Sequence, residues 1–439
     1  MNEFAEPVSF FRLILKNAFS NLGIRIIGVL MAFGLNIYMA QYYGAGGIGS
    51  LVLLIALVEV GALLVKCGFN ISLVKWIPEH LTNYSFASAA TIFRKCFLII
   101  LWVGLALGIL IFFTSDIINN TFFKGDISRL GFIRLAAILI LISACTDYFK
   151  DSLRGLKKIN QSSLLENILP VSIQWISLAI LTYWFFEKNN PLYSYIIALF
   201  ISGIAGLFFL KKFFEKSNSN EKIFHQSSLL LFKNALPFYI IALAQIILLY
   251  SDSLILGFFR NEKEVGLFNI SFRVAGYTSF MLAAMNTIAA PVFSELYHAG
   301  KMEELRTTVQ KTARFTAWIS LPVYIIILSW GKNVLSLFGE EFVPAYFPLV
   351  CVATGQFINA YSGSVGNLLM MTSHHNAVRN IHIVSALLNI VLSFLLVPHY
   401  GINGSAVSTM ISVIVANVLS TWVVRKKFGY YIFLGSGNS

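Results

Sequence analysis

Long apolar runs separated by short polar stretches dominate the pattern of this 439-residue chain. A helix needs about 20 apolar residues to cross the hydrocarbon core of a bilayer. By this criterion the sequence predicts an all-α polytopic membrane protein with about twelve transmembrane helices. The predicted helices cover residues 24–42, 50–66, 96–114, 131–147, 167–186, 194–210, 237–258, 266–290, 315–338, 346–371, 380–398 and 405–424.

A short internal repeat relates the two halves of this pattern. Lys16-Asn17-Ala18 matches Lys233-Asn234-Ala235, and Ile48-Gly49-Ser50-Leu51 matches Val265-Gly266-Leu267-Phe268, both at an offset of 217 residues. Many transporters are built from repeats of membrane segments. The most polar connection has Ser217-Asn218-Ser219-Asn220 at its centre. We therefore predict two pseudo-symmetric lobes of six helices each, residues 1–216 and 217–439.

The charge pattern supports a membrane protein and suggests its orientation. Hydrophobic residues make up 57% of the chain and charged residues 12%, with a mean hydropathy of +0.75. Soluble proteins carry about 25% charged residues. The net charge of +12 does not indicate nucleic-acid binding, because the basic residues are spread over the loops. If the N-terminus is cytoplasmic, inner loops hold 23 basic residues and outer loops 6, so both termini are expected in the cytoplasm.

Motifs for catalysis, cofactors and metals are not supported by the sequence. Gly44-Ala45-Gly46-Gly47-Ile48-Gly49 matches the dinucleotide fingerprint but lies between two predicted membrane helices. No GxxxxGK[ST] sequence is present, and His374-His375 has no third ligand at a suitable spacing. The four cysteines show no metal or redox spacing. We therefore expect a transporter with no catalytic residues, no cofactor and no metal site.

Ionisable residues inside the predicted helices are the first candidates for function. Each costs about 2.5–3.5 kcal/mol at the centre of a membrane helix, so each needs a partner or an aqueous cavity. Mutual pairing and extension of the side chain toward the membrane surface are the structural alternatives to a functional role. Depth within the predicted helices favours function for Glu59, Asp252 and Arg273. The full set is Arg25, Glu59, Arg134, Glu166, Asp252, Arg273 and His382.

Three polar stripes recur at helical spacing within these segments. Side chains spaced by three or four residues share one helix face. Amide, hydroxyl and aromatic groups on such a face would line a wet cavity able to accept sugars, whereas hydrogen bonding between helices is the structural alternative. The stripes consist of Asn269, Arg273 and Tyr277; of His382, Ser385, Asn389 and Ser393; and of Asn167, Gln174 and Ser177.

Several longer stretches resemble the polysaccharide-transport branch of the multidrug/oligosaccharidyl-lipid/polysaccharide exporter superfamily. They are Asp252-Ser253-Leu254-Ile255-Leu256-Gly257, Ala290-Pro291-Val292-Phe293-Ser294-Glu295-Leu296, Gly339-Glu340-Glu341-Phe342 and the segment 387–406. The resemblance extends over nearly the whole chain in the number and order of its predicted helices. It implies two six-helix lobes around a central cavity that opens alternately to the two sides of the membrane.

The resemblance also implies a function. Members of the Wzx type flip undecaprenyl-pyrophosphate-linked oligosaccharides, such as O-antigen, capsule or exopolysaccharide units, from the cytoplasmic to the outer leaflet. Related lipid II flippases have cavity arginines on the first and eighth helices, where Arg25 and Arg273 lie here, but typically carry two further helices. Drug exporters of the superfamily use acidic cavity residues, so Glu59 and Asp252 keep that alternative open. A membrane glycan polymerase would be expected to have a large outer loop.

The resulting expectations name a site, partners and a location. The substrate-binding residues are expected to be Arg25, Arg273, Asn269, Tyr277, His382, Asn389 and Gln174. Glu59, Asp252 and Glu166 are the candidates for charge pairing or for coupling to a proton gradient, a sodium gradient or the membrane potential. The expected partners are the lipid-linked oligosaccharide, membrane lipids and other polysaccharide-assembly proteins, and not nucleic acid. The expected location is the bacterial cytoplasmic (inner) membrane.

Overall fold

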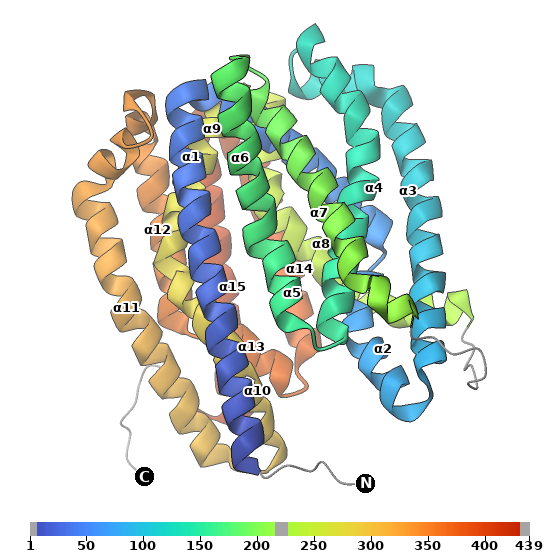
Figure 1. The fold of residues 1–439 in the computed structure, drawn as a ribbon. Coiled ribbons are helices and arrows are strands. Elements are labelled where there is room, and N and C mark those ends of the chain that lie inside the picture. Colours follow the sequence, from blue (N-terminus) through green and yellow to red (C-terminus); the bar gives the residue numbers. More distant parts are fainter. Residues whose placement is uncertain (1–6, 216–226, 431–439) are drawn as a thin grey trace. The chain divides into compact units, whose positions relative to one another are not determined.

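The computed structural model describes residues 7–215 and 227–430, which form helices and no strand (Figure 1). The first part contains α1 (Pro7–Lys66), α2 (Phe69–Asn83), α3 (Phe86–Phe122), α4 (Ile127–Gly155), α5 (Ile159–Ser163), the π-helix η1 (Leu164–Ile168), α6 (Leu169–Trp184) and α7 (Asn190–Glu215). The second part contains α8 (Ser228–Phe259), α9 (Glu262–Gly276), the 3₁₀ turn η2 (Tyr277–Ser279), α10 (Phe280–His298), α11 (Met302–Ser336), the 3₁₀ helix η3 (Glu340–Ala345), α12 (Tyr346–Ser362), α13 (Val365–Met371), α14 (His375–Tyr400) and α15 (Ile402–Phe428).

These helices confirm the all-α polytopic class but not directly the number twelve. Within the described residues, ten helices are long and apolar enough to cross a membrane, and the bent pair Glu262–Asn286 and Ala289–His298 raises the number to eleven. The first two predicted segments, 24–42 and 50–66, both lie in α1, on either side of Gly44. Counting α1 as two membrane crossings would give the expected twelve.

The chain packs as two compact units. Unit 1 comprises residues 1–39 and 54–243, and unit 2 comprises residues 40–53 and 244–439. The middle of α1, residues 40–53, therefore packs with the second half of the chain. The predicted lobe boundary between residues 216 and 217 lies outside the described residues.

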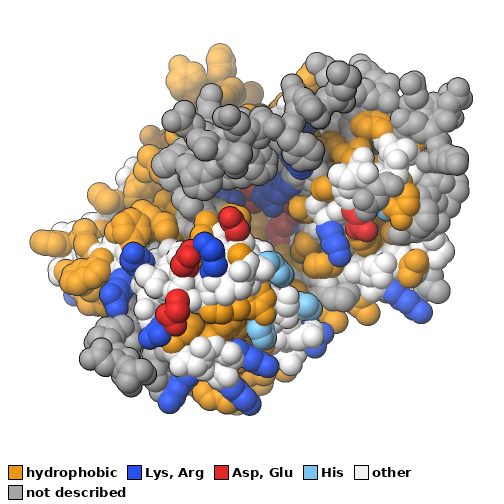
Figure 2. All heavy atoms as spheres, turned by 90° about the horizontal axis from the view of Figure 1, so that it is seen from below, with side chains coloured by type: hydrophobic (Ala, Val, Ile, Leu, Met, Phe, Trp, Pro, Cys, Tyr) orange, Lys and Arg blue, Asp and Glu red, His pale blue; other side chains and the backbone are white. Residues whose placement is uncertain are grey.

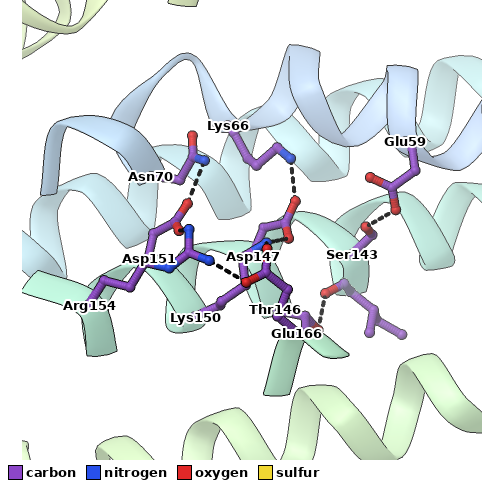
Figure 3. A network of polar contacts seen from close by, with 11 residues as sticks. Glu59, Lys66, Asn70, Ser143, Thr146, Asp147, Lys150, Asp151, Arg154 and Glu166 are labelled. Carbon is purple, nitrogen blue, oxygen red and sulfur yellow. Dashed lines mark hydrogen bonds and ion pairs between the residues drawn. The ribbon is translucent and has the colours of Figure 1, made fainter. Parts of the chain in front are cut away.

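Unit 1 is built around α4. Helices α3 and α4 run side by side (Figure 1), and α4 also packs against α2 and α7. A Cβ added to Gly108 of α3 would lie 2.9 Å from the carbonyl oxygen of Ala137 on α4, so glycine permits this close approach. Pro170 follows η1 in the first turn of α6, where its missing N–H costs no helical hydrogen bond. The π turn places Glu166 toward the α4 side of the unit (Figure 3).

Unit 2 contains the kink that interrupts α1. Gly44 has φ +66°, which glycine adopts without strain. The backbone N–H of Ala45 donates to Glu341 Oε1 at 2.8 Å, so the side chain of η3 satisfies a donor at the kink. Gly44, the first glycine of the sequence that matches the dinucleotide fingerprint, therefore forms a backbone kink. Elsewhere in unit 2, α15 packs against α14 and α12, and α12 packs against α9.

A reciprocal glycine contact joins α1 to α9 within unit 2. A Cβ added to Gly49 would lie 3.0 Å from the Gly266 nitrogen, and a Cβ added to Gly266 would lie 3.0 Å from the Gly49 nitrogen. The first would also meet the Glu262 carbonyl oxygen and the second the Ala45 carbonyl oxygen. Both pairs, 49 with 266 and 45 with 262, have the offset of the sequence repeat. The contact thus relates the two copies as a twofold axis would.

Candidate functional site

A network of charged side chains lies inside unit 1, and we call it the unit 1 charge cluster (Figure 3). Four of its residues occupy one face of α4, because they are spaced by three, four and seven positions. Two more lie two turns apart on α1, and the last lies on η1. The members are Glu59, Lys66, Asp147, Lys150, Asp151, Arg154 and Glu166.

Most members of the unit 1 charge cluster pair with one another. Lys66 Nζ lies 2.5 Å from Asp147 Oδ2, and Lys150 Nζ lies 2.7 Å from Asp147 Oδ1. Arg154 bridges Asp151, at 3.1 Å, and Glu166. The side chain of Lys66 is only 5% exposed, so its charge depends on this pairing. Glu166 also lies 4.0 Å from Lys150, so it is surrounded by two basic side chains.

Glu59 differs from the other acids of the cluster. Its Oε1 accepts a hydrogen bond from Ser143 Oγ at 2.9 Å, and no basic group of the described residues lies within ion-pair distance. Glu59 lines a cavity of about 240 Å³ together with Gln174, Glu166 and Lys150. The structure therefore brings the expected residues Gln174, Glu59 and Glu166 together in unit 1.

A second buried acid, Asp252 of α8, lies in unit 2 and is 2% exposed. Ser393 Oγ donates to its Oδ1 at 2.7 Å, Thr409 Oγ1 donates to its Oδ2 at 2.6 Å, and Asn389 Nδ2 lies 3.3 Å from Oδ2. Ser251 Oγ fixes Asn389 by donating to its Oδ1 at 2.7 Å. The partners of this carboxylate among the described residues are neutral. We call Asp252, Asn389, Ser393 and Thr409 the Asp252 cluster.

A cavity of about 300 Å³ adjoins the Asp252 cluster within unit 2. Asn389 and Thr409 belong to both the cluster and the cavity wall. The expected residue His382 also lines the cavity, and its buried Nδ1 has no hydrogen-bond partner among the described residues. The lining residues are Gln245, Leu248, Leu249, Phe272, Gln356, Asn359, His382, Ser385, Asn389, Thr409, Ser412, Val413, Ala416 and Asn417.

Neither expected arginine forms an ion pair among the described residues, although the positive charge of Arg25 acts on the Glu166 carboxylate. Arg273 on α9 is exposed, and its Nε donates to Asn269 Oδ1 at 2.7 Å. Arg25 on α1 is half-buried, and its Nε has no hydrogen-bond partner among the described residues. By contrast, Arg134 on α4 lies 3.8 Å from Asp116. Tyr277, the third stripe residue, is half-buried in η2.

Sequence reasoning missed parts of both polar regions. The 23 basic residues counted in the inner loops include Lys66, Lys150 and Arg154, but these three are helical and ion-paired. Alternating acids and bases at spacings of three and four residues along α4 could have revealed this face. In unit 2 the missed residues are neutral, so no charge in an apolar run marks them. They include Thr409, Gln245, Gln356, Asn359 and Asn417.

Comparison with known families places most of the chain in one of them. The family described as "Polysaccharide biosynthesis protein" matches residues 14–297, and the family described as "MatE" matches residues 237–395. Among curated relatives, a "Putative O-antigen transporter" of Shigella flexneri is 23% identical over 95% of this chain and 99% of its own length. A "Probable low-salt glycan biosynthesis flippase", Agl15 of Haloferax volcanii, is 20% identical over 94% of this chain and 82% of its own length.

Solved structures share the fold at low sequence identity. An inward-facing multidrug resistance transporter of the MATE family aligns with a TM-score of 0.73 at 15% identity, covering 94% of this chain and 98% of that one. The lipid II flippase MurJ, in an inward closed conformation, aligns with a TM-score of 0.70 at 16% identity, covering 94% and 87%. With the family match over residues 14–297, the chain belongs to the polysaccharide biosynthesis protein family of the multidrug/oligosaccharidyl-lipid/polysaccharide exporter superfamily.

Proposed function

We propose that the chain is a flippase for a polyprenyl-pyrophosphate-linked oligosaccharide, a repeat unit of O-antigen, capsule or exopolysaccharide. It would move this lipid from the cytoplasmic to the outer leaflet by alternating access, without covalent chemistry. The relatives named as a glycan biosynthesis flippase and an O-antigen transporter support this substrate class. The expected lipid carrier is undecaprenyl pyrophosphate, with other polysaccharide-assembly proteins supplying and consuming the substrate.

The observation that carries the proposal is a pair of arginines, Arg25 and Arg273, that form no ion pair among the described residues. Lys66, Lys150 and Arg154 are paired with acids of the unit 1 charge cluster. Arg273 Nε donates to the neutral Asn269, and Arg25 has a buried Nε without a hydrogen-bond partner among the described residues. A guanidinium group binds phosphate oxygens in a bidentate manner. Arg25 and Arg273 are therefore available for the pyrophosphate of the substrate.

The test is flipping of defined lipid-linked oligosaccharides in proteoliposomes by Arg273→Ala and Arg273→Lys. We expect Arg273→Ala to lose most of the flipping activity and Arg273→Lys to keep part of it, because lysine retains the charge without the planar fork. Arg134→Ala is the matched control, since Arg134 also lies in a membrane helix but already faces Asp116. Wild-type flipping by a well-folded Arg273→Ala protein would reject this role of Arg273.

A cation-coupled drug exporter is the main alternative, because Glu59 and Asp252 are buried or half-buried acids without a basic partner among the described residues. A drug exporter would place acid rather than arginine at its substrate. We expect deletion of the gene to remove surface polysaccharide without raising sensitivity to cationic dyes. The opposite phenotype would favour the exporter. A lipid II flippase and a membrane glycan polymerase, the latter an enzyme, would show instead as loss of lipid II flipping or of chain elongation.

The energy source follows from charge. A pyrophosphate diester carries about two negative charges, and each is worth about 2.3 kcal/mol per 100 mV of membrane potential. With a negative cytoplasm, outward movement of the substrate is downhill. When the empty carrier returns, the positive charges of Arg25 and Arg273 would move against the same potential unless a negative charge accompanies them or their charge is otherwise balanced. We propose that Asp252 or Glu59 supplies this compensation, by taking up a proton or a sodium ion, because their hydrogen-bond partners among the described residues are neutral.

The orientation proposed for the chain has both termini in the cytoplasm. Basic side chains are spread over the face shown in Figure 2, which would then be the cytoplasmic face. Lys66, Lys150 and Arg154 leave the loop count because they are paired inside unit 1, and the bias keeps its sign without them. A single cysteine at Lys263, in a cysteine-free background, should react only with an external reagent. Its side chain is 61% exposed, and labelling from the cytoplasm alone would reverse the assignment.

A further inference from the structure

The cavities of the two units differ in chemistry. The unit 1 cavity is lined by charged residues, among them Glu59, Asp147 and Lys150. The unit 2 cavity has no Lys, Arg, Asp or Glu among its lining residues. Its polar groups are amides, hydroxyls and one histidine. An anionic pyrophosphate or a cationic drug would need an opposite charge that this wall does not present.

Several polar groups in the unit 2 wall have unused hydrogen-bonding capacity. Gln245 and Asn359 make no hydrogen bond to the described residues, and each amide offers two donors and an acceptor. Gln356 uses only its Oε1, which accepts from Ser279 Oγ at 2.8 Å. The buried atoms His382 Nδ1 and Ser385 Oγ have no partner among the described residues. The wall therefore presents donors and acceptors together.

This combination matches a sugar ring. Each sugar hydroxyl both donates and accepts, so adjacent hydroxyls pair well with amide side chains. Phe272 supplies an apolar surface in the same wall, suited to the C–H face of a pyranose. The cavity volume of about 300 Å³ is enough for one sugar ring.

We propose that the unit 2 cavity is a glycan subsite that binds an uncharged sugar of the lipid-linked oligosaccharide. Gln356, Asn359 and Asn417 hydrogen-bond its hydroxyls, while the pyrophosphate is bound outside this cavity. The subsite rests on the proposed flippase function and adds to it a separate place for the sugar. Asp252 is excluded from direct contact with that sugar, because it lies behind Asn389 and Thr409 and is not among the lining residues.

Asn359→Leu is the variant of choice, because Asn359 has no hydrogen bond to the described residues and its loss leaves no protein atom unpaired. Gln356→Leu is the second variant, since Ser279 Oγ keeps Gly276 O as an acceptor at 3.2 Å. Asn367→Leu is the matched control. Asn367 is an amide of unit 2 outside the cavity wall, hydrogen-bonded to Asn286 O.

The experiment uses the full-length chain in proteoliposomes and two probes. The first is the lipid-linked oligosaccharide pool extracted from the source cells, and its flipping is measured against concentration. The second is undecaprenyl pyrophosphate without sugar, used as an inhibitor. A neutral hydrogen bond contributes about 0.5–1.5 kcal/mol, which corresponds to a change in half-saturation of about 2- to 12-fold. We expect each cavity variant to raise half-saturation for the pool by that factor and to leave inhibition by the bare lipid within twofold.

The other outcomes overturn the proposal in distinguishable ways. Equal weakening toward both probes would mean that the cavity binds the pyrophosphate or that the variants are damaged, and the Asn367→Leu control separates these two. No change toward either probe would mean that the cavity takes no part in binding the substrate. If the wild-type chain flips none of the pool, the proposed flippase function fails, and the subsite falls with it.

Discussion

Replacing Asp252 with asparagine tests whether this buried acid is a coupling group or a structural one. Its carboxylate receives two short hydrogen bonds, from Ser393 at 2.7 Å and from Thr409 at 2.6 Å. Hydrogen bonds to a charged group contribute about 1.5–3 kcal/mol each, so these two supply about 3–6 kcal/mol. Removing the carboxylate from water costs several kcal/mol, and no base of the described residues offsets that cost. The charge is thus barely compensated, which favours uptake of a cation.

Asp252→Asn should therefore change stability little. The substitution removes the negative charge and keeps one acceptor oxygen. The other oxygen becomes an NH₂ group, which can donate to the hydroxyl of Ser393 or Thr409 once that hydroxyl has rotated to accept. The exception is Asn389 Nδ2, a donor that would face another donor if the new amide replaced Oδ2. The loss of that contact costs about 1–2 kcal/mol, partly offset by the charge that no longer has to be buried. We expect a net change of about 1 kcal/mol in the free energy of unfolding.

The assay is thermal unfolding of the purified protein in detergent over a range of sodium concentrations and pH values. A ligand present at 100 times its Kd stabilises the folded state by about 2.7 kcal/mol. The wild-type protein should gain stability with sodium or with falling pH, because either cation neutralises Asp252. Asp252→Asn should lose that dependence. Asp116→Asn is the control, since Asp116 is 69% exposed and lies near Arg134. A variant that keeps the wild-type cation dependence, or that loses more than about 3 kcal/mol, would refute this reasoning.

Two further predictions concern stability. Lys66→Met should lower the free energy of unfolding by about 3 kcal/mol, because it removes one of the two lysines that pair with Asp147. Lys75→Met, at an exposed position, is the control and should have little effect in the same denaturation assay. Gly49→Ala should lower the free energy of unfolding by about 1–3 kcal/mol or more, because the new Cβ would lie 1.7 Å from the Glu262 carbonyl oxygen. Gly46→Ala is the control and should be neutral or slightly stabilising, because no atom lies within 4 Å of the new Cβ. Equal stability of the Gly49→Ala and Gly46→Ala proteins would contradict the close contact.

The helices could be predicted from the sequence because apolar length is a local property. The same holds for the Asn269–Arg273 contact and for the stripe that brings His382 and Asn389 into one cavity, since both follow from helical spacing. Pairing between distant helices could not be predicted. Lys66 meets Asp147 across 81 residues, and Thr409 meets Asp252 across 157 residues, and no periodicity encodes such contacts.

The charge cluster shows a second limit of sequence reasoning. A basic residue near the end of an apolar run looks the same whether it faces water or a buried acid. The count of basic residues in inner loops therefore includes Lys66, at the end of the predicted helix 50–66, although its side chain is almost fully buried. A single neutral residue such as Asn359, which lies on none of the three predicted stripes, cannot be recognised as a cavity residue from the sequence. An amide in a membrane helix is equally consistent with hydrogen bonding between helices.

The contact between Gly49 and Gly266 has the symmetry expected of a chain that arose by fusion of two copies of a half-length protein. In an isologous dimer, a residue on the twofold axis contacts its own copy. Every other contact occurs twice, because residue i contacts residue j and j contacts i. Positions 49 and 266 meet in that way, and the carbonyl groups of Ala45 and Glu262 approach the opposite glycine in matching fashion. A half-length ancestor could thus have paired with itself through a single glycine. Because backbone atoms of residues 45 and 262 make the contact, this packing restricts the residue type at positions 49 and 266 only.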